Sequence, residues 1–152
     1  MEFFTYFLKE SMKVEARKRQ AQQIKLNAIE EIKEKLKTTV ELGDERSEAG
    51  FLIELGSVYA NNSEFDLSDT MYRQSLAIAR QITDKHIEII SLVNLGLTFM
   101  ERMDYSQAYS YYQKALRITH EIGDKGFKQE IMEHIDELRN MINIEKMAGN
   151  GN

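Results

Sequence analysis

Residues 55–59 read LGSVY, and residues 95–99 read LGLTF. The forty-residue interval recurs at other aromatic, aliphatic and acidic positions: Phe65 with Tyr105, Tyr72 with Tyr112, Leu76 with Leu116, Ile82 with Ile122, and Asp84 with Asp124. A partial earlier copy lies at Ala28, Ile32, Leu36, Leu42 and Asp44. A period of roughly 20–50 residues is typical of stacked supersecondary units, each too small to bury its apolar face alone.

The matched residues resemble the tetratricopeptide repeat. The first helix of that unit carries Leu-Gly and an aromatic residue, as at Leu52, Leu55, Gly56 and Tyr59, and again at Leu92, Leu95, Gly96 and Phe99. The second helix carries alternating small and aromatic residues, as at Phe65, Ser68, Tyr72 and Ser75, and at Tyr105, Ala108, Tyr112 and Ala115. Arg80 and His120 stand where the family commonly has proline. The repeat also exceeds the usual length of about 34 residues. It looks like the longer repeats of kinesin light chains, G-protein-signalling modulators and bacterial peptide-pheromone receptors.

Apolar spacing and turn residues predict helices throughout. Leu52, Leu55, Gly56 and Tyr59 follow the spacing of a helix stripe. Glycine in mid-helix costs about 1 kcal/mol against alanine, so Gly56 and Gly96 indicate close approach of a neighbouring helix. Helix stops and N-caps recur at Gly43-Asp44, Thr83-Asp84 and Gly123-Asp124, and Asp104 with Gln107 predicts a further cap. We expect seven helices, near 4–20, 24–42, 45–61, 66–82, 85–101, 105–122 and 126–147.

The fold class expected is therefore all-α, an α-solenoid of antiparallel helix pairs. The resemblance implies a right-handed superhelix. We expect a single domain over residues 1–148, followed by a disordered tail at 149–152. Its parts are an atypical N-terminal helix (1–23), a partial repeat (24–44), full repeats (45–84 and 85–124) and a closing helix (126–147), whose apolar stripe is one-sided.

Composition agrees with one domain that has a continuous core. The chain has 152 residues, of which 42% are hydrophobic and 30% charged. It contains no cysteine, which excludes disulfides and thiolate metal sites, and no proline. Its first residues lack the basic segment of a signal peptide and are too short an apolar run to span a membrane. A cytoplasmic protein without a membrane partner is expected.

Charge is distributed unevenly along the chain. Residues 1–40 contain nine Lys/Arg and six Asp/Glu, whereas residues 41–152 contain eleven and nineteen. The acidic repeats would repel a phosphate backbone, so no nucleic-acid partner is expected. The basic run from Lys13 to Lys25 reads either as a solvated helix face or as a segment attracted to the acidic repeats of another subunit.

No catalytic or cofactor motif is apparent. His86, His120 and His134 belong to different predicted helices, and none has a second ligand at metal spacing on its own face. There is no glycine-rich phosphate loop and no nucleophile elbow. The acidic residues of the last predicted helix read as its solvated face. The chain is predicted to be no enzyme and to need no metal or cofactor.

The predicted helix at 85–101 has more apolar residues than one core stripe requires. Ile90, Val93, Leu97 and Met100 form a second stripe, which either packs within the stack or floors a groove for a partner. The resemblance implies that such first helices line a concave groove. The predicted partner-binding residues are Ile53, Ser57, Asn61, Ile90, Val93, Asn94, Leu97, Met100 and Glu101.

The character of the ligand follows from the same positions. The clamp that some family members use to grip an acidic C-terminus would need Lys, Asn and Arg where this chain has Ile53, Ser57, Asn94, Glu130 and His134. Only Asn94 fits. Glu101, Glu130, Glu133 and Glu137 instead predict a protein or peptide ligand that is neutral to basic and partly apolar.

An aromatic cluster marks the N-terminus. The apolar residues of this segment are too large a group to be left in water: Phe3, Phe4, Tyr6, Phe7, Leu8 and Met12. We predict that Phe3, Phe4, Phe7 and Leu8 serve self-association, for which a homodimer is the simplest form. Three alternatives are open for what covers these side chains: the chain's own first repeat, a second subunit or another protein. The function expected is a non-enzymatic binding scaffold; the alternatives are a structural homo-oligomer or a regulatory peptide sensor.

Overall fold

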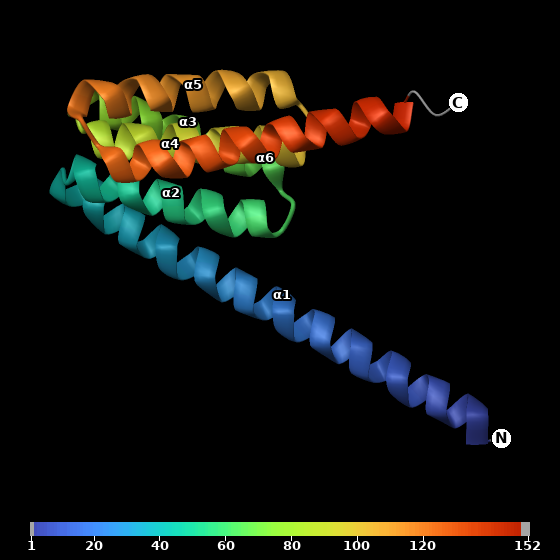
Figure 1. Ribbon diagram of the computed structural model, residues 1–152. Helices are drawn as coiled ribbons and strands as arrows, with labels where there is room; N and C mark the ends of the chain where they lie inside the picture. Colours follow the sequence, from blue (N-terminus) through green and yellow to red (C-terminus); the bar gives the residue numbers. More distant parts are fainter. Residues whose placement is uncertain (1, 150–152) are drawn as a thin grey trace.

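The computed structural model consists of helices joined by short turns (Figure 1). It describes the backbone of residues 2–149 and the side chains of residues 6–144 and Met147. The helices are α1 (Glu2–Leu42), α2 (Glu45–Asn61), α3 (Phe65–Gln81), α4 (Lys85–Glu101), α5 (Tyr105–Ile122) and α6 (Lys125–Gly149). They pack as consecutive pairs, and the described residues contain no strand, which confirms the predicted all-α solenoid.

The N-terminal region differs from the prediction. The helices expected at 4–20 and 24–42 are one continuous helix of 41 residues, α1. The physical reason is that neither glycine nor proline occurs before Gly43, so nothing in the sequence ends the helix earlier. Of the tail expected at 149–152, residues 150–152 lie outside the described residues, and Gly149 ends α6.

Left-handed residues and aspartate caps separate the helices. Gly43, Thr83 and Gly123 have φ of 68°, 57° and 73°, and each precedes a capping aspartate. Asp84 accepts hydrogen bonds from the backbone N–H groups of His86 and Ile87, both at 3.1 Å. These contacts satisfy donors that the first turn of α4 leaves without partners, so the predicted helix boundary is confirmed.

Two glycines allow the helices of each repeat to approach closely. A β-carbon on Gly56 would stand 2.6 Å from Cε1 of Tyr72, and one on Gly96 would stand 2.5 Å from Cε1 of Tyr112. The predicted close approach is confirmed, because the tyrosine of the second helix occupies the space that a side chain on the first would need. The cost of glycine in the helix is offset by burial of an aromatic ring.

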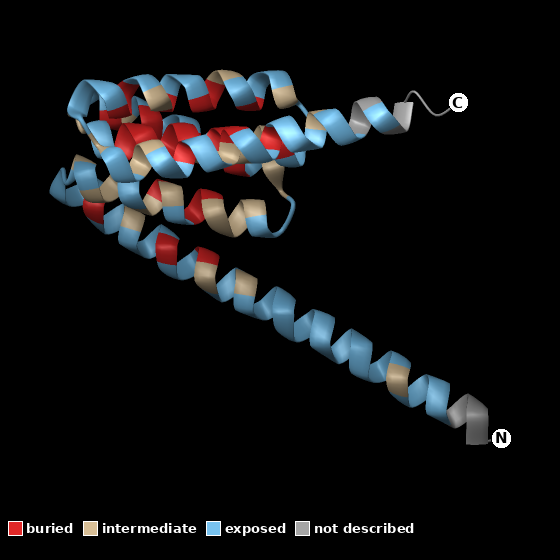
Figure 2. Cartoon of the chain, viewed as in Figure 1, coloured by how far each residue is buried: buried red, intermediate tan, exposed pale blue. Residues whose placement is uncertain are grey.

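Helix α4 is the centre of the core, and it contacts α2, α3, α5 and α6. Its buried residues include Ile89, Leu92 and Leu95, each with no exposed surface. Figure 2 shows the buried residues concentrated on α4 and its neighbours, whereas the first half of α1 is exposed. The sequence predicted a helix apolar nearly all round, and α4 is buried on most of its sides for that reason.

Helix α6 packs one face against the repeats and leaves the other in solvent. Ile131, Ile135 and Leu138 join the main core. At the positions that correspond to Gly96 and Phe99, α6 carries Asp136 and Arg139, which form an exposed ion pair at 2.9 Å. Helix α6 therefore lacks the glycine and the aromatic residue that the first helices of the two full repeats use for close packing.

Candidate functional site

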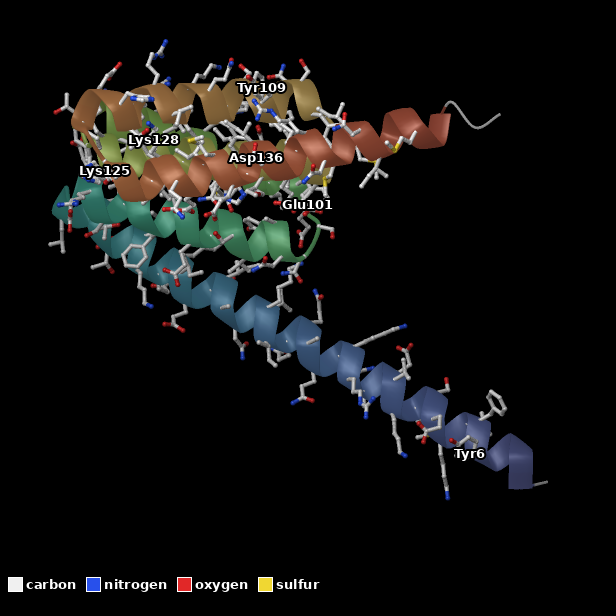
Figure 3. The ribbon with its side chains drawn as sticks, in the orientation of Figure 1. Tyr6, Glu101, Tyr109, Lys125, Lys128 and Asp136 are labelled. Carbon is white, nitrogen blue, oxygen red and sulfur yellow. The ribbon has the colours of Figure 1, made fainter. Side chains whose placement is uncertain are left out.

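A cleft of about 440 Å³ lies between the C-terminal ends of α2 and α4. Ser57, Asn61, Asn94, Leu97 and Glu101 line it from the two helices. Figure 3 shows Glu101 near the turn between α2 and α3, whereas Lys125 and Lys128 lie towards the opposite end of the repeats. Glu101 is the sole charged residue among the described residues that line the cleft, so the site has a negative charge.

A tyrosine from α3 completes the floor of the cleft. The Tyr72 side chain is 2% exposed, and its hydroxyl group lies 3.1 Å from Oγ of Ser57. The Ser57 hydroxyl donates its own proton to the backbone carbonyl of Ile53 at 3.0 Å, so the tyrosine hydroxyl is the donor in its contact with Ser57. The pair therefore presents a fixed polar floor.

The α4 side of the cleft combines an amide with an aliphatic side chain. Asn94 donates from Nδ2 to the backbone carbonyl of Ile90 at 3.0 Å. Because its nitrogen is engaged within the helix, the side-chain carbonyl oxygen is the group that can accept from a ligand N–H. Leu97 is half-buried beside it, one turn further along α4, and supplies apolar surface.

The structure brings together five of the nine residues predicted for partner binding, namely Ser57, Asn61, Asn94, Leu97 and Glu101. Val93 and Met100 instead lie in the core, 6% and 7% exposed. Their predicted place on a ligand-facing stripe is corrected, because α4 has several neighbouring helices and this part of the stripe packs within the stack. Ile53 and Ile90 are half-buried and lie outside the lining of this cleft, Ile53 packing against the core.

Sequence reasoning missed the other half of the lining: Ala60, Ser63, Phe65, Tyr72 and Thr98. Phe65 and Tyr72 belong to the second helix of the repeat, whereas the prediction considered only first helices. The spacing of Tyr72 to Gly56 was a usable signal, since the ring that packs over Gly56 carries its hydroxyl group to Ser57, the next residue of α2.

The tyrosine of the next repeat, Tyr112, lacks the hydrogen bond that Tyr72 makes. Leu97 stands forty residues after Ser57, so the position whose hydroxyl group contacts Tyr72 carries no hydroxyl group in the second repeat. The Tyr112 hydroxyl is buried without a hydrogen-bond partner among the described residues. Burial, together with the Glu137 carboxylate, raises the pKa of Tyr112. His134 covers the other face of the ring, with centroids 5.5 Å apart and planes 10° from parallel.

The residues predicted for self-association lie at the start of α1. The side chains of Phe3 and Phe4 lie outside the described residues. Phe7 and Leu8 are 59% and 49% exposed, and Tyr6 and Met12 are 62% and 72% exposed. Cover by the chain's own first repeat is therefore wrong for these residues, because α1 runs past the end of α2 before it reaches them (Figure 1).

Neither a metal cluster nor a membrane-crossing segment is found in the part of the chain that the structure describes. Within these residues, no group of three or more His, Asp or Glu side chains is placed to hold a metal ion. Over the same residues, no helix combines the length and apolarity needed to cross a membrane.

The paired helices, the tyrosine over each repeat glycine and the cleft between first helices define a helical-repeat protein. Residues 47–121 match the family model of the tetratricopeptide repeat, and the chain is a tetratricopeptide repeat protein. Such repeats generally mediate protein–protein interactions. No curated protein matches the sequence. The similarity to the longer repeats of kinesin light chains stays a prediction.

Proposed function

We propose that the chain is a non-enzymatic scaffold that binds a neutral to basic, partly apolar peptide in the cleft between α2 and α4. The observation that carries the proposal is the composition of the lining. Leu97 and Phe65 offer apolar surface, Asn61 and Asn94 offer amides, and Glu101 is the one charged group among the described lining residues. Ligand sites of this kind combine an apolar surface with a few orienting polar groups.

Charge selects among peptides. The cleft has a carboxylate at one end and no lysine or arginine in its described lining. Glu130, Glu133 and Glu137 follow on α6, which packs beside α4. A ligand with an acidic terminus would meet repulsion along this path, whereas a lysine or arginine beside an aliphatic residue would find complementary groups.

A displayed library of random linear peptides, selected on the full chain, tests the proposal. We expect the enriched peptides to combine Lys or Arg with Leu, Ile, Met or Phe. Leu97→Ser removes apolar surface. Serine is also the residue at the equivalent position of the preceding repeat, Ser57. Glu101→Lys reverses the charge. Each variant is expected to weaken binding of an enriched peptide by about tenfold, or ~1.4 kcal/mol.

The matched control is Glu121→Lys, an exposed charge reversal on α5 outside the described lining of the cleft. It should bind the enriched peptides as the wild type does. Enrichment of acidic peptides, or equal binding by wild type, Leu97→Ser and Glu101→Lys, would contradict the proposal.

A further inference from the structure

The first half of α1 is an exposed arm, which we define as residues 6–24. Every residue of the arm is exposed except half-buried Glu10 (Figure 2). It carries large apolar side chains in water, among them Leu8 and Met12, which are 49% and 72% exposed and lie on one side of the helix. An apolar surface of this kind on a projecting helix indicates a binding surface.

The arm cannot turn back onto its own chain. Helix α1 is continuous from Glu2 to Leu42, and no glycine or proline interrupts it. Among the described helices it packs only against α2, through Ile29 and Ile32. The arm leads away from the repeats, with Tyr6 near its far end (Figures 1 and 3). No described residue of the same chain covers the arm, so the cover that we consider is another molecule.

The arm has the charge that the cleft between α2 and α4 selects. It contains five Lys/Arg and two Asp/Glu, and the two carboxylates are already paired, Glu10 with Lys13 at 2.7 Å and Glu15 with Lys18 at 3.2 Å. Two arms laid against each other would therefore repel, whereas the acidic repeats attract them. Leu8 and Met12 stand one helical turn apart, the spacing of anchors in helix-in-groove recognition, and Lys9 and Lys13 follow in the adjacent row.

The C-terminal end of the arm, next to Lys25, lies beside the cleft. Lys25, the residue that follows the arm in the sequence, forms an ion pair with Glu64. Ser63, the residue before Glu64, lines the cleft. From Lys25 to Leu8 the helix rises about 25 Å, at 1.5 Å per residue. In a two-fold pair, the two arms can run in opposite directions without packing against each other. The tip of each arm, near Leu8, then returns towards the region of the other chain that surrounds its Lys25.

We propose that the arm of one chain occupies the cleft between α2 and α4 of a second copy, with Leu8 and Met12 against Leu97 and the arm's lysines towards Glu101, in a reciprocal homodimer. The inference rests on the proposed function of the cleft and names its occupant. The arm is the neutral to basic, partly apolar peptide that the lining requires, held as a preformed helix. Preformed structure lowers the entropy cost of binding.

Sedimentation equilibrium of full-length chains tests the pairing. Wild type is expected to be a dimer, and Leu8→Glu/Met12→Glu in the arm and Leu97→Ser/Glu101→Lys in the cleft are each expected to raise the dimer dissociation constant by at least about tenfold. An equimolar mixture of the two variants should regain a heterodimer, because one intact arm meets one intact cleft. Glu121→Lys serves as control, and circular dichroism verifies that each variant is folded.

Three results would overturn the proposal. One is a wild type that stays monomeric at high micromolar concentration; vesicles of phosphatidylcholine with phosphatidylglycerol, tested in parallel, would then show whether a lipid surface covers the arm. Another is a dimer that survives the cleft substitutions. The third is a mixture that fails to recover a heterodimer although both variants are folded, which would mean that an intact arm does not bind an intact cleft.

Peptide selection on the Leu8→Glu/Met12→Glu variant separates this inference from the proposed function. Its cleft is intact and free of a competing arm, so enriched peptides should bind it more tightly than they bind wild type. Peptide binding without a wild-type dimer would overturn the inference alone. Absence of peptide binding to this variant would contradict the proposed function as well.

Discussion

The ring of Tyr112 on α5 occupies the space in which a side chain on Gly96 of α4 would stand. A β-carbon placed on Gly96 lies 2.5 Å from Cε1 and 2.8 Å from Cδ1 of the tyrosine, closer than real contacts allow. Tyr112 is completely buried, so the ring has no room to withdraw. This contact fixes the distance between the two helices of the second repeat, and Gly56 with Tyr72 does the same in the first.

Replacement of Gly96 by alanine is expected to destabilise the fold by about 1–3 kcal/mol, because overpacking outweighs the better helix propensity of alanine. Gly50 provides a matched control, since it lies in α2 and a β-carbon at this position would meet no atom within 4 Å. Gly50→Ala should stabilise by about 0.5–1 kcal/mol. Urea denaturation measures both; equal effects of the two substitutions would mean that the tyrosine gives way at no cost.

The two repeat tyrosines should respond differently to loss of the hydroxyl group. Tyr72→Phe removes the hydrogen bond to Ser57 and is expected to cost about 0.5–1.5 kcal/mol. Tyr112→Phe removes a buried hydroxyl without a described partner and should leave stability unchanged or raise it. Thermal melting of both variants gives the comparison, and a loss at Tyr112 as large as at Tyr72 would indicate that a bound water satisfies its hydroxyl group.

Neighbouring residues of α4 should differ sharply in their tolerance of charge. Val93→Glu places a carboxylate in the core and should unfold the domain, at a cost of several kcal/mol. Leu97→Glu, on the cleft, should keep a helical and cooperatively melting chain. Circular dichroism separates the two, and a folded Val93→Glu variant would contradict the burial described for α4.

Stability should depend on pH through Glu88. Its side chain is 8% exposed and accepts hydrogen bonds from Arg80 and Lys85, both at 2.9 Å. Burial opposes ionisation, but the two cationic donors outweigh it and lower the pKa of Glu88 from 4.5. A lowered folded-state pKa stabilises the fold above the unfolded-state value, and that contribution is lost as pH falls from 4.5 through the folded-state pKa.

We therefore expect Glu88→Gln to melt below wild type at neutral pH, with a difference that shrinks as the solution is acidified below 4.5. Thermal melts across this range measure the difference. Glu121→Gln, at an exposed position on α5, is the control and should follow wild type throughout. A difference between Glu88→Gln and wild type that stays constant with pH would mean that the ion pairs add nothing to stability.

The repeat, most helix boundaries and the role of the glycines could be predicted from the amino-acid sequence alone. The predicted limits 45–61, 85–101 and 105–122 coincide with α2, α4 and α5, because aspartate caps and left-handed residues act locally and are legible in the chain. That the first two predicted helices form one helix could also have been predicted, because no glycine or proline occurs before Gly43.

The packing of the helices determines which apolar side chains of α4 face the cleft and which face the core. Periodicity places Val93 and Leu97 on one stripe, but neighbours on several sides bury Val93 and leave Leu97 half-buried in the cleft. Likewise, Phe65 and Tyr72 reach the cleft from α3. Whether a residue is buried depends on the helices that surround it as well as on its own helix. A pattern in the sequence can therefore predict that residues share one face of a helix, but it cannot predict which neighbouring helix covers that face.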